Sequence, residues 1–201
     1  MRCLTLAECL RQQGWLVTFV CRQLPGNCHA TISAHGFELL RLSCTSRDDM
    51  QGYEQWLGTS QLEDAQQCLS LLRNQTRFDL CVVDHYALDQ QWHIAMAPTY
   101  DKLLVIDDLA NRHHRSDFLL DQTLGRQADE YRHLVPPACR VFTGKQYMLL
   151  RPEFAEMRPI AMERREHTWP ITEVLIAMGG NDPDNSCERA LSGVDYFRRE
   201  A

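Results

Sequence analysis

The stretch Phe78-Asp-Leu-Cys-Val-Val-Asp84 decides the fold. It is a short apolar run that ends in an acid, and a second such run, Lys102 to Asp107, follows a helical pattern at Leu88 to Ala97. Strand, helical crossover and strand indicate a parallel α/β sheet. Ligands of such sheets bind beyond the carboxyl ends of the strands. The residues expected at that edge are Asp84, His85, Tyr86, Asp107 and Asp108.

The same alternation of helix and strand patterns extends outward in both directions. Upstream, helices are predicted at residues 3–13, 27–34 and 62–73, and strands at residues 16–21 and 37–42. Residues 44–60 are polar and are predicted to form a loop. Downstream, a short apolar piece at 118–120 precedes a last strand or hinge at 147–150. The fold class predicted from these patterns is α/β.

A change of composition after residue 155 predicts a domain boundary. Residues 156–172 are polar and charged, as expected of a linker. A strand pattern at 173–178, a glycine turn and a helical pattern at 186–199 then predict the start of a second nucleotide-binding domain, residues 173–201. Residues 1–155 are the first, Rossmann-like domain. Since no strand precedes its first helix and the second domain stops after one helix, we expect a chain truncated at both ends.

Composition and charge exclude several classes of protein. The 201 residues contain 21 Lys and Arg against 27 Asp and Glu, a formal charge of −6, so a large basic surface for nucleic acid or anionic membranes is not expected. No apolar run reaches the roughly 18 residues that span a bilayer. Glu8 and Arg11 interrupt the N-terminal region where a signal peptide needs an apolar segment. The sequence indicates a cytoplasmic protein.

The spacing of the cysteines and histidines favours structural roles over disulfide or metal-binding roles. Nine cysteines are scattered without a C-x-x-C pair, which predicts reduced thiols rather than disulfides. Those with apolar neighbours, expected to be buried, are Cys3, Cys9, Cys68 and Cys81. The adjacent His113 and His114 are expected to be a solvated loop pair. No histidine spacing fits a metal site, so no metal is predicted.

The strand-end residues allow both chemical and structural interpretations. Asp84, His85 and Tyr86 could supply a base, an orienting carboxylate and a phenol for a sugar hydroxyl or leaving oxygen. Alternatively, Asp84 caps the next helix and Tyr86 is partly buried. The neighbours Asp107 and Asp108 point to opposite faces of a strand, so they are not expected to form a catalytic dyad. One of them is expected to cap a helix or to bond with Arg112.

The glycine turn is equally open to two interpretations. Gly179 and Gly180 would let the backbone approach a diphosphate at the start of the following helix. Alternatively the pair forms only a turn, and Asp182 or Asn185 is the N-cap of that helix.

Seven motifs follow one another in an order that resembles a known family. They are Met1-Arg-Cys-Leu-Thr-Leu-Ala7, Cys21-Arg-Gln-Leu-Pro-Gly26, Asp84-His-Tyr86, Val105-Ile-Asp-Asp-Leu-Ala-Asn-Arg112, Leu119-Leu-Asp-Gln122, Leu149-Leu-Arg-Pro-Glu-Phe154 and Met178-Gly-Gly-Asn-Asp-Pro-Asp-Asn185. The family is that of the UDP-2,4-diacetamido-2,4,6-trideoxy-β-L-altropyranose hydrolases of pseudaminic acid biosynthesis. The resemblance extends over the whole chain and implies a two-Rossmann, glycosyltransferase-B-like architecture.

The resemblance implies a metal-independent hydrolase that needs no cofactor. Water attacks the anomeric carbon of the UDP-sugar and releases UDP with inversion. Tyr86 would contact the reacting sugar, Asp84 and His85 would shape its pocket, and the loop at Gly179 and Gly180 would face the diphosphate. Asp182 and Asn185 complete the implied substrate-binding residues of this loop. A monomer is expected, with a UDP-sugar as its partner.

The chain departs from the family at its start. Family members begin with a strand and a G-x-G-H loop before the M-R-C-L-T-L-A helix, and the histidine of that loop is the implied general base. That histidine would precede Met1, so we expect a fragment with little activity. The alternatives are a glycosyltransferase of the same fold, in which an acceptor hydroxyl replaces water, and a non-catalytic remnant.

Overall fold

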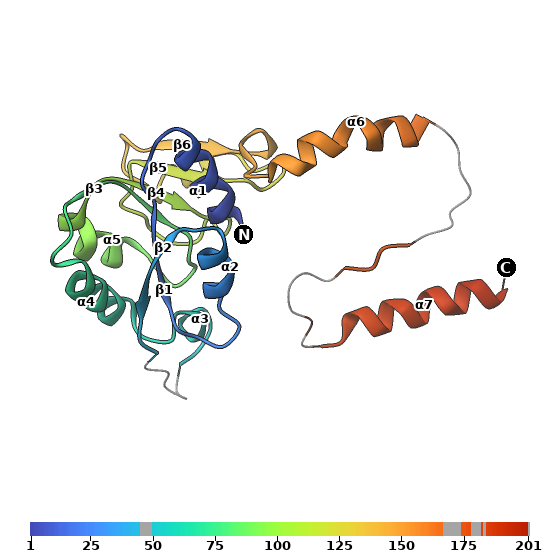
Figure 1. Cartoon of the computed structure of the whole chain (residues 1–201), viewed down its shortest axis with the longest axis horizontal. Coiled ribbons are helices and arrows are strands. Elements are labelled where there is room, and N and C mark those ends of the chain that lie inside the picture. The colour runs from blue at the N-terminus through green and yellow to red at the C-terminus, as the bar shows by residue number, and fades with distance from the viewer. Residues whose placement is uncertain (45–49, 167–173, 178–181, 183, 201) are drawn as a thin grey trace. The chain divides into compact units, whose positions relative to one another are not determined.

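The computed structural model describes residues 1–44, 50–166, 174–177, 182 and 184–200. It divides the chain into two compact units, Met1–Arg151 and Pro152–Ala201. The first unit contains all the strands of the described residues, and Figure 1 shows its helices beside its two sheets. No helix among the described residues is long and apolar enough to cross a membrane.

The first unit alternates helices and strands. Its α-helices are α1 (Arg2–Gln12), α2 (His29–Ala34), α3 (Glu54–Leu57), α4 (Gln61–Leu72) and α5 (Gln90–Met96). Its strands are β1 (Thr18–Arg22), β2 (Glu38–Leu42), β3 (Phe78–Val83), β4 (Tyr100–Ile106), β5 (Phe118–Asp121) and β6 (Arg140–Thr143). Three short 3₁₀ helices are η1 (Ala97–Thr99), η2 (Ala128–Tyr131) and η3 (Lys145–Tyr147).

All strand pairs are parallel, which confirms the α/β class. β1 pairs with β2, and a second sheet has the order β3-β4-β5-β6. In the second sheet Val83 lies opposite Val105, and Ile106 lies opposite Leu120. The carboxyl ends of its strands therefore meet at one edge, as the sequence predicts.

The larger core lies between this sheet and helices α4 and α5. Cys68 and Leu72 of α4, Trp92 of α5 and the strand residues Leu103 and Val105 are buried there. β4 is apolar on both faces, as expected of a strand covered on both sides. All nine cysteines are free thiols. Cys68 is buried and Cys3 and Cys81 are half-buried, but the prediction for Cys9 is wrong, because that residue lies on the exposed side of α1.

Three sequence predictions about elements are wrong. Of the strand or hinge predicted at 147–150, the strand is wrong, since β6 has already ended at Thr143 and Gly144 turns the chain with a φ of +96°. The predicted loop at 44–60 contains helix α3, which Gly58 ends in the left-handed conformation. Residues 174–177 have no regular structure, because no partner strand pairs with them among the described residues.

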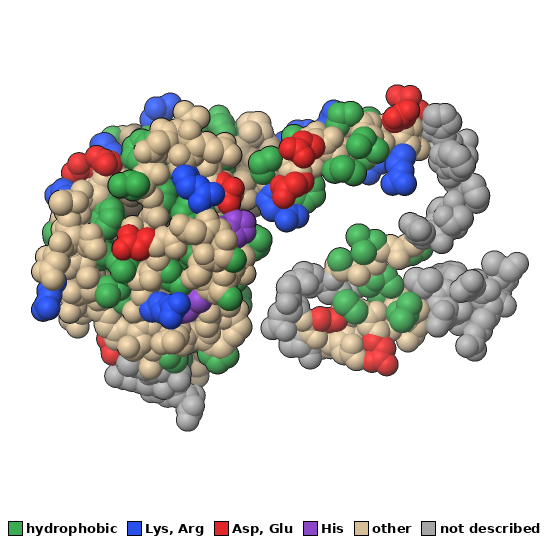
Figure 2. All heavy atoms as spheres, in the orientation of Figure 1, with side chains coloured by type: hydrophobic (Ala, Val, Ile, Leu, Met, Phe, Trp, Pro, Cys, Tyr) green, Lys and Arg blue, Asp and Glu red, His purple; other side chains and the backbone are tan. Residues whose placement is uncertain are grey.

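The second unit contains two described helices, α6 (Pro152–Glu166) and α7 (Ser186–Glu200). The N-terminal part of the predicted linker is thus helical, and the helix continues through Pro159. Figure 2 shows hydrophobic side chains along α6, among them the exposed Phe154, Met157 and Ile160. The proposed division into a linker and a second domain stays a prediction.

Candidate functional site

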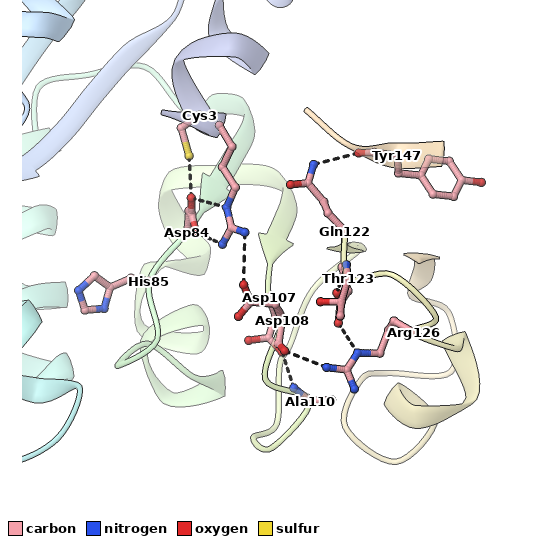
Figure 3. A network of polar contacts seen from close by, with 12 residues as sticks. Cys3, Asp84, His85, Asp107, Asp108, Ala110, Gln122, Thr123, Arg126 and Tyr147 are labelled. Atoms are coloured by element: carbon pink, nitrogen blue, oxygen red, sulfur yellow. Dashed lines mark hydrogen bonds and ion pairs between the residues drawn. The ribbon is translucent and has the colours of Figure 1, made fainter. Parts of the chain in front are cut away.

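An ion pair joins α1 to the ends of two strands (Figure 3). The guanidinium of Arg2 donates from Nε to Oδ2 of Asp84 at 3.0 Å and from Nη2 to Oδ1 at 2.7 Å. Its Nη1 lies 3.5 Å from Oδ2 of Asp108. Burial raises the pKa of Asp84, but the hydrogen bonds and charge of Arg2 outweigh it, so the net pKa lies below the usual range. Asp84 is therefore an ionised, oriented carboxylate.

This arrangement excludes the capping interpretation of Asp84. The N-cap of the next helix, α5, is Asp89, whose side chain accepts a hydrogen bond from the Gln91 amide at 2.7 Å. The thiol of Cys3 instead donates to Asp84 at 3.2 Å. Asp84 therefore bonds with Arg2 and Cys3 at the edge of the sheet and does not cap the helix that follows it.

Tyr86 is half-buried beside this ion pair. A hydrogen bond to Asp108 raises the pKa of Tyr86 to about 12, with burial as a second cause. The phenol therefore keeps its proton at neutral pH and acts as a hydrogen-bond donor rather than as a base. Its position next to Asp84 and Asp108 lets it contact a hydroxyl or a leaving oxygen at this edge.

Two aromatic rings from the predicted loop join Tyr86. The Tyr53 ring centroid lies 5.0 Å and the Trp56 centroid 5.8 Å from that of Tyr86. The Trp56 side chain is 58% exposed, and the guanidinium of Arg112 lies 5.9 Å from the Tyr86 ring centroid. The three rings form an aromatic surface, one that can stack on the face of a base or a sugar ring.

His85 is turned away from the Asp84 ion pair (Figure 3). Its Nδ1 accepts a hydrogen bond from the Ala87 amide at 3.0 Å. Burial lowers the pKa of His85, and a hydrogen bond with the Trp56 backbone opposes this shift only in part. The imidazole is therefore neutral and shapes the edge of the site between Trp56 and the strand end.

A second polar cluster lies beside the first, and its central residues Asp107, Asp121 and Tyr131 are fully buried. The Tyr131 hydroxyl lies 2.9 Å from Oδ2 of Asp107 and 2.7 Å from Oδ2 of Asp121. Arg112 Nη1 lies 2.8 Å from Asp107, and Arg126 Nε lies 2.6 Å from Asp121. The predicted bond between one acid of the pair and Arg112 is confirmed. Both carboxylates are occupied, so this cluster supports the edge rather than reacting there.

The loop histidines differ from each other. His113 is exposed, as predicted, but His114 is 2% exposed, so the prediction of a solvated pair is wrong. The His114 ring stacks on that of His93 with centroids 5.5 Å apart, and its amide donates to the Leu134 carbonyl. Stacking and this backbone bond explain why a polar loop residue is buried.

We expect the protein to lose stability in mild acid because of His93. Its Nδ1 accepts a hydrogen bond from the Arg115 amide, and burial together with His114 lowers the pKa of His93 to about 3. The unfolded histidine titrates near 6.5, so below that pH the unfolded chain binds more protons. The free energy of unfolding should fall by about 2 kcal/mol between pH 7.5 and pH 5.

Urea denaturation at several pH values measures this dependence. The His93→Gln variant should lose most of it, whereas the exposed His113→Gln variant should keep it. The His85→Gln variant should lose only the smaller part of the pH dependence that comes from the lowered pKa of His85. An unchanged pH dependence in His93→Gln would contradict the assignment.

The candidate substrate-binding residues of the second unit are only partly described. Gly179 and Gly180 lie outside the described residues. The carboxylate of Asp182 accepts hydrogen bonds from the amides of Ser186 and Cys187, both at 2.8 Å, at the start of α7. Asn185 has a φ of +52° directly before that helix. Asp182 thus has the capping geometry that the sequence offered as one alternative.

Sequence reasoning missed several residues of the site. Arg2 carried one signal, since a cation in the first turn of a helix opposes the helix dipole and needs another partner. Asp121 lies in the quoted Leu119-Leu-Asp-Gln122 motif, but its bonds to Arg126 and Tyr131 have no recognisable spacing. Tyr53 and Trp56 depend on contacts with the distant Tyr86 and left no local pattern. Among the described residues, no group of three or more His, Cys, Asp or Glu could hold a metal ion.

Comparison with known proteins agrees in part with the motif resemblance. The chain is 32% identical over 124 residues to the UDP-2,4-diacetamido-2,4,6-trideoxy-beta-L-altropyranose hydrolase of Campylobacter jejuni. The aligned residues are 61% of this chain and 42% of that enzyme, so the chain spans less than half of the relative. No family model matches the chain. The chain is therefore similar to this sugar-nucleotide hydrolase over part of its length.

Proposed function

We propose that this chain belongs to a hydrolase that releases UDP from a UDP-2,4-diacetamido-2,4,6-trideoxyhexose, as in pseudaminic acid biosynthesis. The observation that carries the proposal is the cluster of Arg2, Asp84, Tyr86 and Asp108 at the carboxyl edge of the sheet. The motifs that build this cluster are among those that resemble the hydrolases. The name of the Campylobacter jejuni relative supports the same substrate class.

In the proposed reaction, water attacks the anomeric carbon while the bond from that carbon to the UDP oxygen breaks. Water gives up a proton to a base, and UDP leaves with the electrons of the broken bond. Tyr86 contacts the reacting sugar, and Asp84 and His85 shape its pocket. The aromatic surface of Tyr53, Trp56 and Tyr86 offers a place for the sugar or uracil ring.

The architecture completes the proposal. The first unit would be one Rossmann-like half of a glycosyltransferase-B-like molecule, a cytoplasmic monomer. The loop at Gly179 and Gly180 would face the diphosphate from the second half, together with Asp182 and Asn185. The resemblance assigns the general base to a G-x-G-H loop, and the 201 residues contain no such string, so this chain should turn over slowly by itself.

The test compares this chain with a chimera, in which the segments of the Campylobacter jejuni hydrolase outside the aligned region are added to this chain. UDP release from the altropyranose substrate should be near background for the chain and much faster for the chimera, because a general base contributes about 10²- to 10⁴-fold. EDTA should leave the rate unchanged. Equal rates would place the base within this chain, and transfer to an added acceptor without free sugar would identify a transferase instead.

Tyr86→Phe in the chimera should lower kcat by about 10- to 100-fold and change KM little, if the phenol stabilises the transition state. Tyr147→Phe is the matched control, since Tyr147 is 42% exposed and lies in η3. The rate and the pH profile of UDP release are measured for both variants. A change confined to KM would assign Tyr86 to substrate binding alone.

A further inference from the structure

The phenol of Tyr86 has one proton, and the carboxylate of Asp108 accepts it in a hydrogen bond. This bond is the largest cause of the raised pKa of Tyr86, whereas Asp84 acts on the phenol through its charge. The carboxylate of Asp84 is already occupied by two hydrogen bonds from Arg2 and one from the Cys3 thiol. The contact of Arg2 with Asp108 is longer, at 3.5 Å, which leaves lone pairs of Asp108 for the phenol.

The turn that carries Asp108 has a fixed backbone. Nη2 of Arg126 donates to the Asp108 carbonyl at 2.8 Å, and the Ala110 amide donates to Oδ2 of Asp107 at 2.9 Å (Figure 3). Ala110 has a φ of +49°, in the left-handed region that residues other than glycine rarely adopt. Such conformations persist where the surroundings enforce them, and they concentrate at functional sites. The carboxylate of Asp108 is therefore attached to a turn that is set before a ligand binds.

The ring of Tyr86 is held by groups other than Asp108. The rings of Tyr53 and Trp56 pack against it, and the Arg112 guanidinium lies 5.9 Å from its centroid. With the ring and the carboxylate both held, the phenol proton points toward Asp108. A hydroxyl has one proton and two lone pairs, so the lone pairs of Tyr86 stay available to a ligand.

We infer that Asp108 is the positioning residue of Tyr86, and that Tyr86 faces the sugar as a hydrogen-bond acceptor rather than as a donor. This inference rests on the proposed function, because it takes the ligand to be the sugar of that substrate. The group that Tyr86 binds must carry an N–H or an O–H. A 2,4-diacetamido-2,4,6-trideoxyhexose has three such groups, the acetamido N–H at carbon 2, the hydroxyl at carbon 3 and the acetamido N–H at carbon 4.

The acceptor role assigns Tyr86 to the sugar and not to the leaving group. The UDP oxygen that departs is itself an acceptor, and the phenol proton is engaged with Asp108. UDP leaves with the electrons of the broken bond as an anion, which needs no acid because a phosphate of this kind has a pKa of about 6. Tyr86 thus keeps its proton throughout the reaction, and its contribution is to hold the sugar in one orientation.

The first test follows Tyr86 in the 201-residue chain and needs no turnover. The tyrosines are replaced by 3-fluorotyrosine, and the ¹⁹F signal that is absent from the Tyr86→Phe variant reports the pKa of Tyr86. Asp108→Asn should lower this pKa by about 1 to 2, because the amide has no charge. Asp84→Asn should lower it less, and Asp79→Asn, which changes an exposed acid of β3, should leave it unchanged.

The second test measures UDP release by the chimera. Tyr86→Phe and Asp108→Asn should each lower kcat/KM by about 10-fold, and the double variant should be no slower than Tyr86→Phe, since Asp108 acts through the phenol. Substrate analogues then identify the donor: fluorine at carbon 3 removes the O–H, and an acetoxy group at carbon 2 or 4 removes one N–H. The analogue without the bonded donor should lose about 10-fold more in the chimera than in its Tyr86→Phe variant.

Several results would overturn the inference. They are an unchanged pKa of Tyr86 in Asp108→Asn, losses of Tyr86→Phe and Asp108→Asn that multiply in the double variant, and analogues that all lose equally in the chimera and in Tyr86→Phe. If Asp108→Asn does not fold, the unmodified chain decides, because a Tyr86 signal that titrates like free 3-fluorotyrosine would mean that the phenol has no carboxylate partner. A chimera that releases no UDP would reject the proposed function and the sugar as ligand, while the titration would still decide whether Asp108 holds the phenol.

Discussion

Replacing Arg22 by methionine should lower the free energy of unfolding by about 3 to 5 kcal/mol, because it leaves a buried carboxylate without its cation. Arg22 Nη2 lies 2.5 Å from Oδ1 of Asp64, and the two side chains are 4% and 6% exposed. The same guanidinium donates to the Ser43 carbonyl and to Gln67. It therefore ties the end of β1 to α4 and to the turn after β2. Urea denaturation followed by circular dichroism measures the loss.

A double-mutant cycle separates the ion pair from the packing of Arg22. Asp64 also accepts a hydrogen bond from Trp92 Nε1 at 2.9 Å, so Asp64→Leu alone costs stability too. The double variant with methionine at 22 and leucine at 64 should be more stable than the sum of the two losses predicts, since no buried charge remains. Additive losses would mean that the two side chains do not interact. Arg41→Met, on exposed β2 surface, is the control.

Replacing Tyr131 by phenylalanine should cost about 3 kcal/mol of stability. The Tyr131 hydroxyl stands between the carboxylates of Asp107 and Asp121, and all three residues are 0% exposed. Without it, two buried acids lose a shared donor and face each other, with Arg112, Arg126 and the amides of Ala110 and Thr123 as remaining partners. A hydrogen bond to a charged group contributes about 1.5 to 3 kcal/mol, and the single phenol proton lies between two carboxylates that would otherwise repel each other.

The loss in Tyr131→Phe should shrink at low pH, because protonated carboxyls no longer repel each other. Asp107 and Asp121 both have lowered pKa values in the folded protein, against the effect of burial, owing to their hydrogen bonds and cations. The two carboxylates stabilise the folded protein fully at a pH above their pKa in the unfolded chain. This stabilisation is lost as the pH falls through their pKa in the folded protein. Thermal melts at a series of pH values from 7 down to 2 test this, with Tyr147→Phe as control. A pH-independent loss would assign the effect to packing.

The sequence predicts the parts of the fold that have local periodicity. β3, α5 and β4 follow from apolar runs and helical spacing, because each pattern lies within one element. β6 was missed, since Arg140-Val-Phe-Thr143 is short and its place in the sheet depends on pairing with β5. Helix α3 was missed for a similar reason, because it has only four residues.

The candidate site is predictable from the sequence to the same extent as the fold. The position of Asp84, Tyr86 and Asp108 follows from strand ends, since parallel strands bring those ends together. The partners of these residues come from α1 and α3, which are distant in sequence. No pattern in Met1-Arg2-Cys3 or around Trp56 reveals that they meet Asp84 and Tyr86. That information lies in the packing of helices against the sheet.

The outer edges of β1 and β3 also affect how the chain behaves in solution. Open apolar strand edges are templates for pairing with other molecules, and within the described residues β1 pairs with β2 alone and β3 with β4 alone. We therefore expect its solubility to be limited by association through β1 and β3 well before the folded state is lost. During synthesis, the same edges would make the chain a target for chaperones. Degradation by cellular quality control, and not thermal unfolding, would then determine the amount of this protein in the cell.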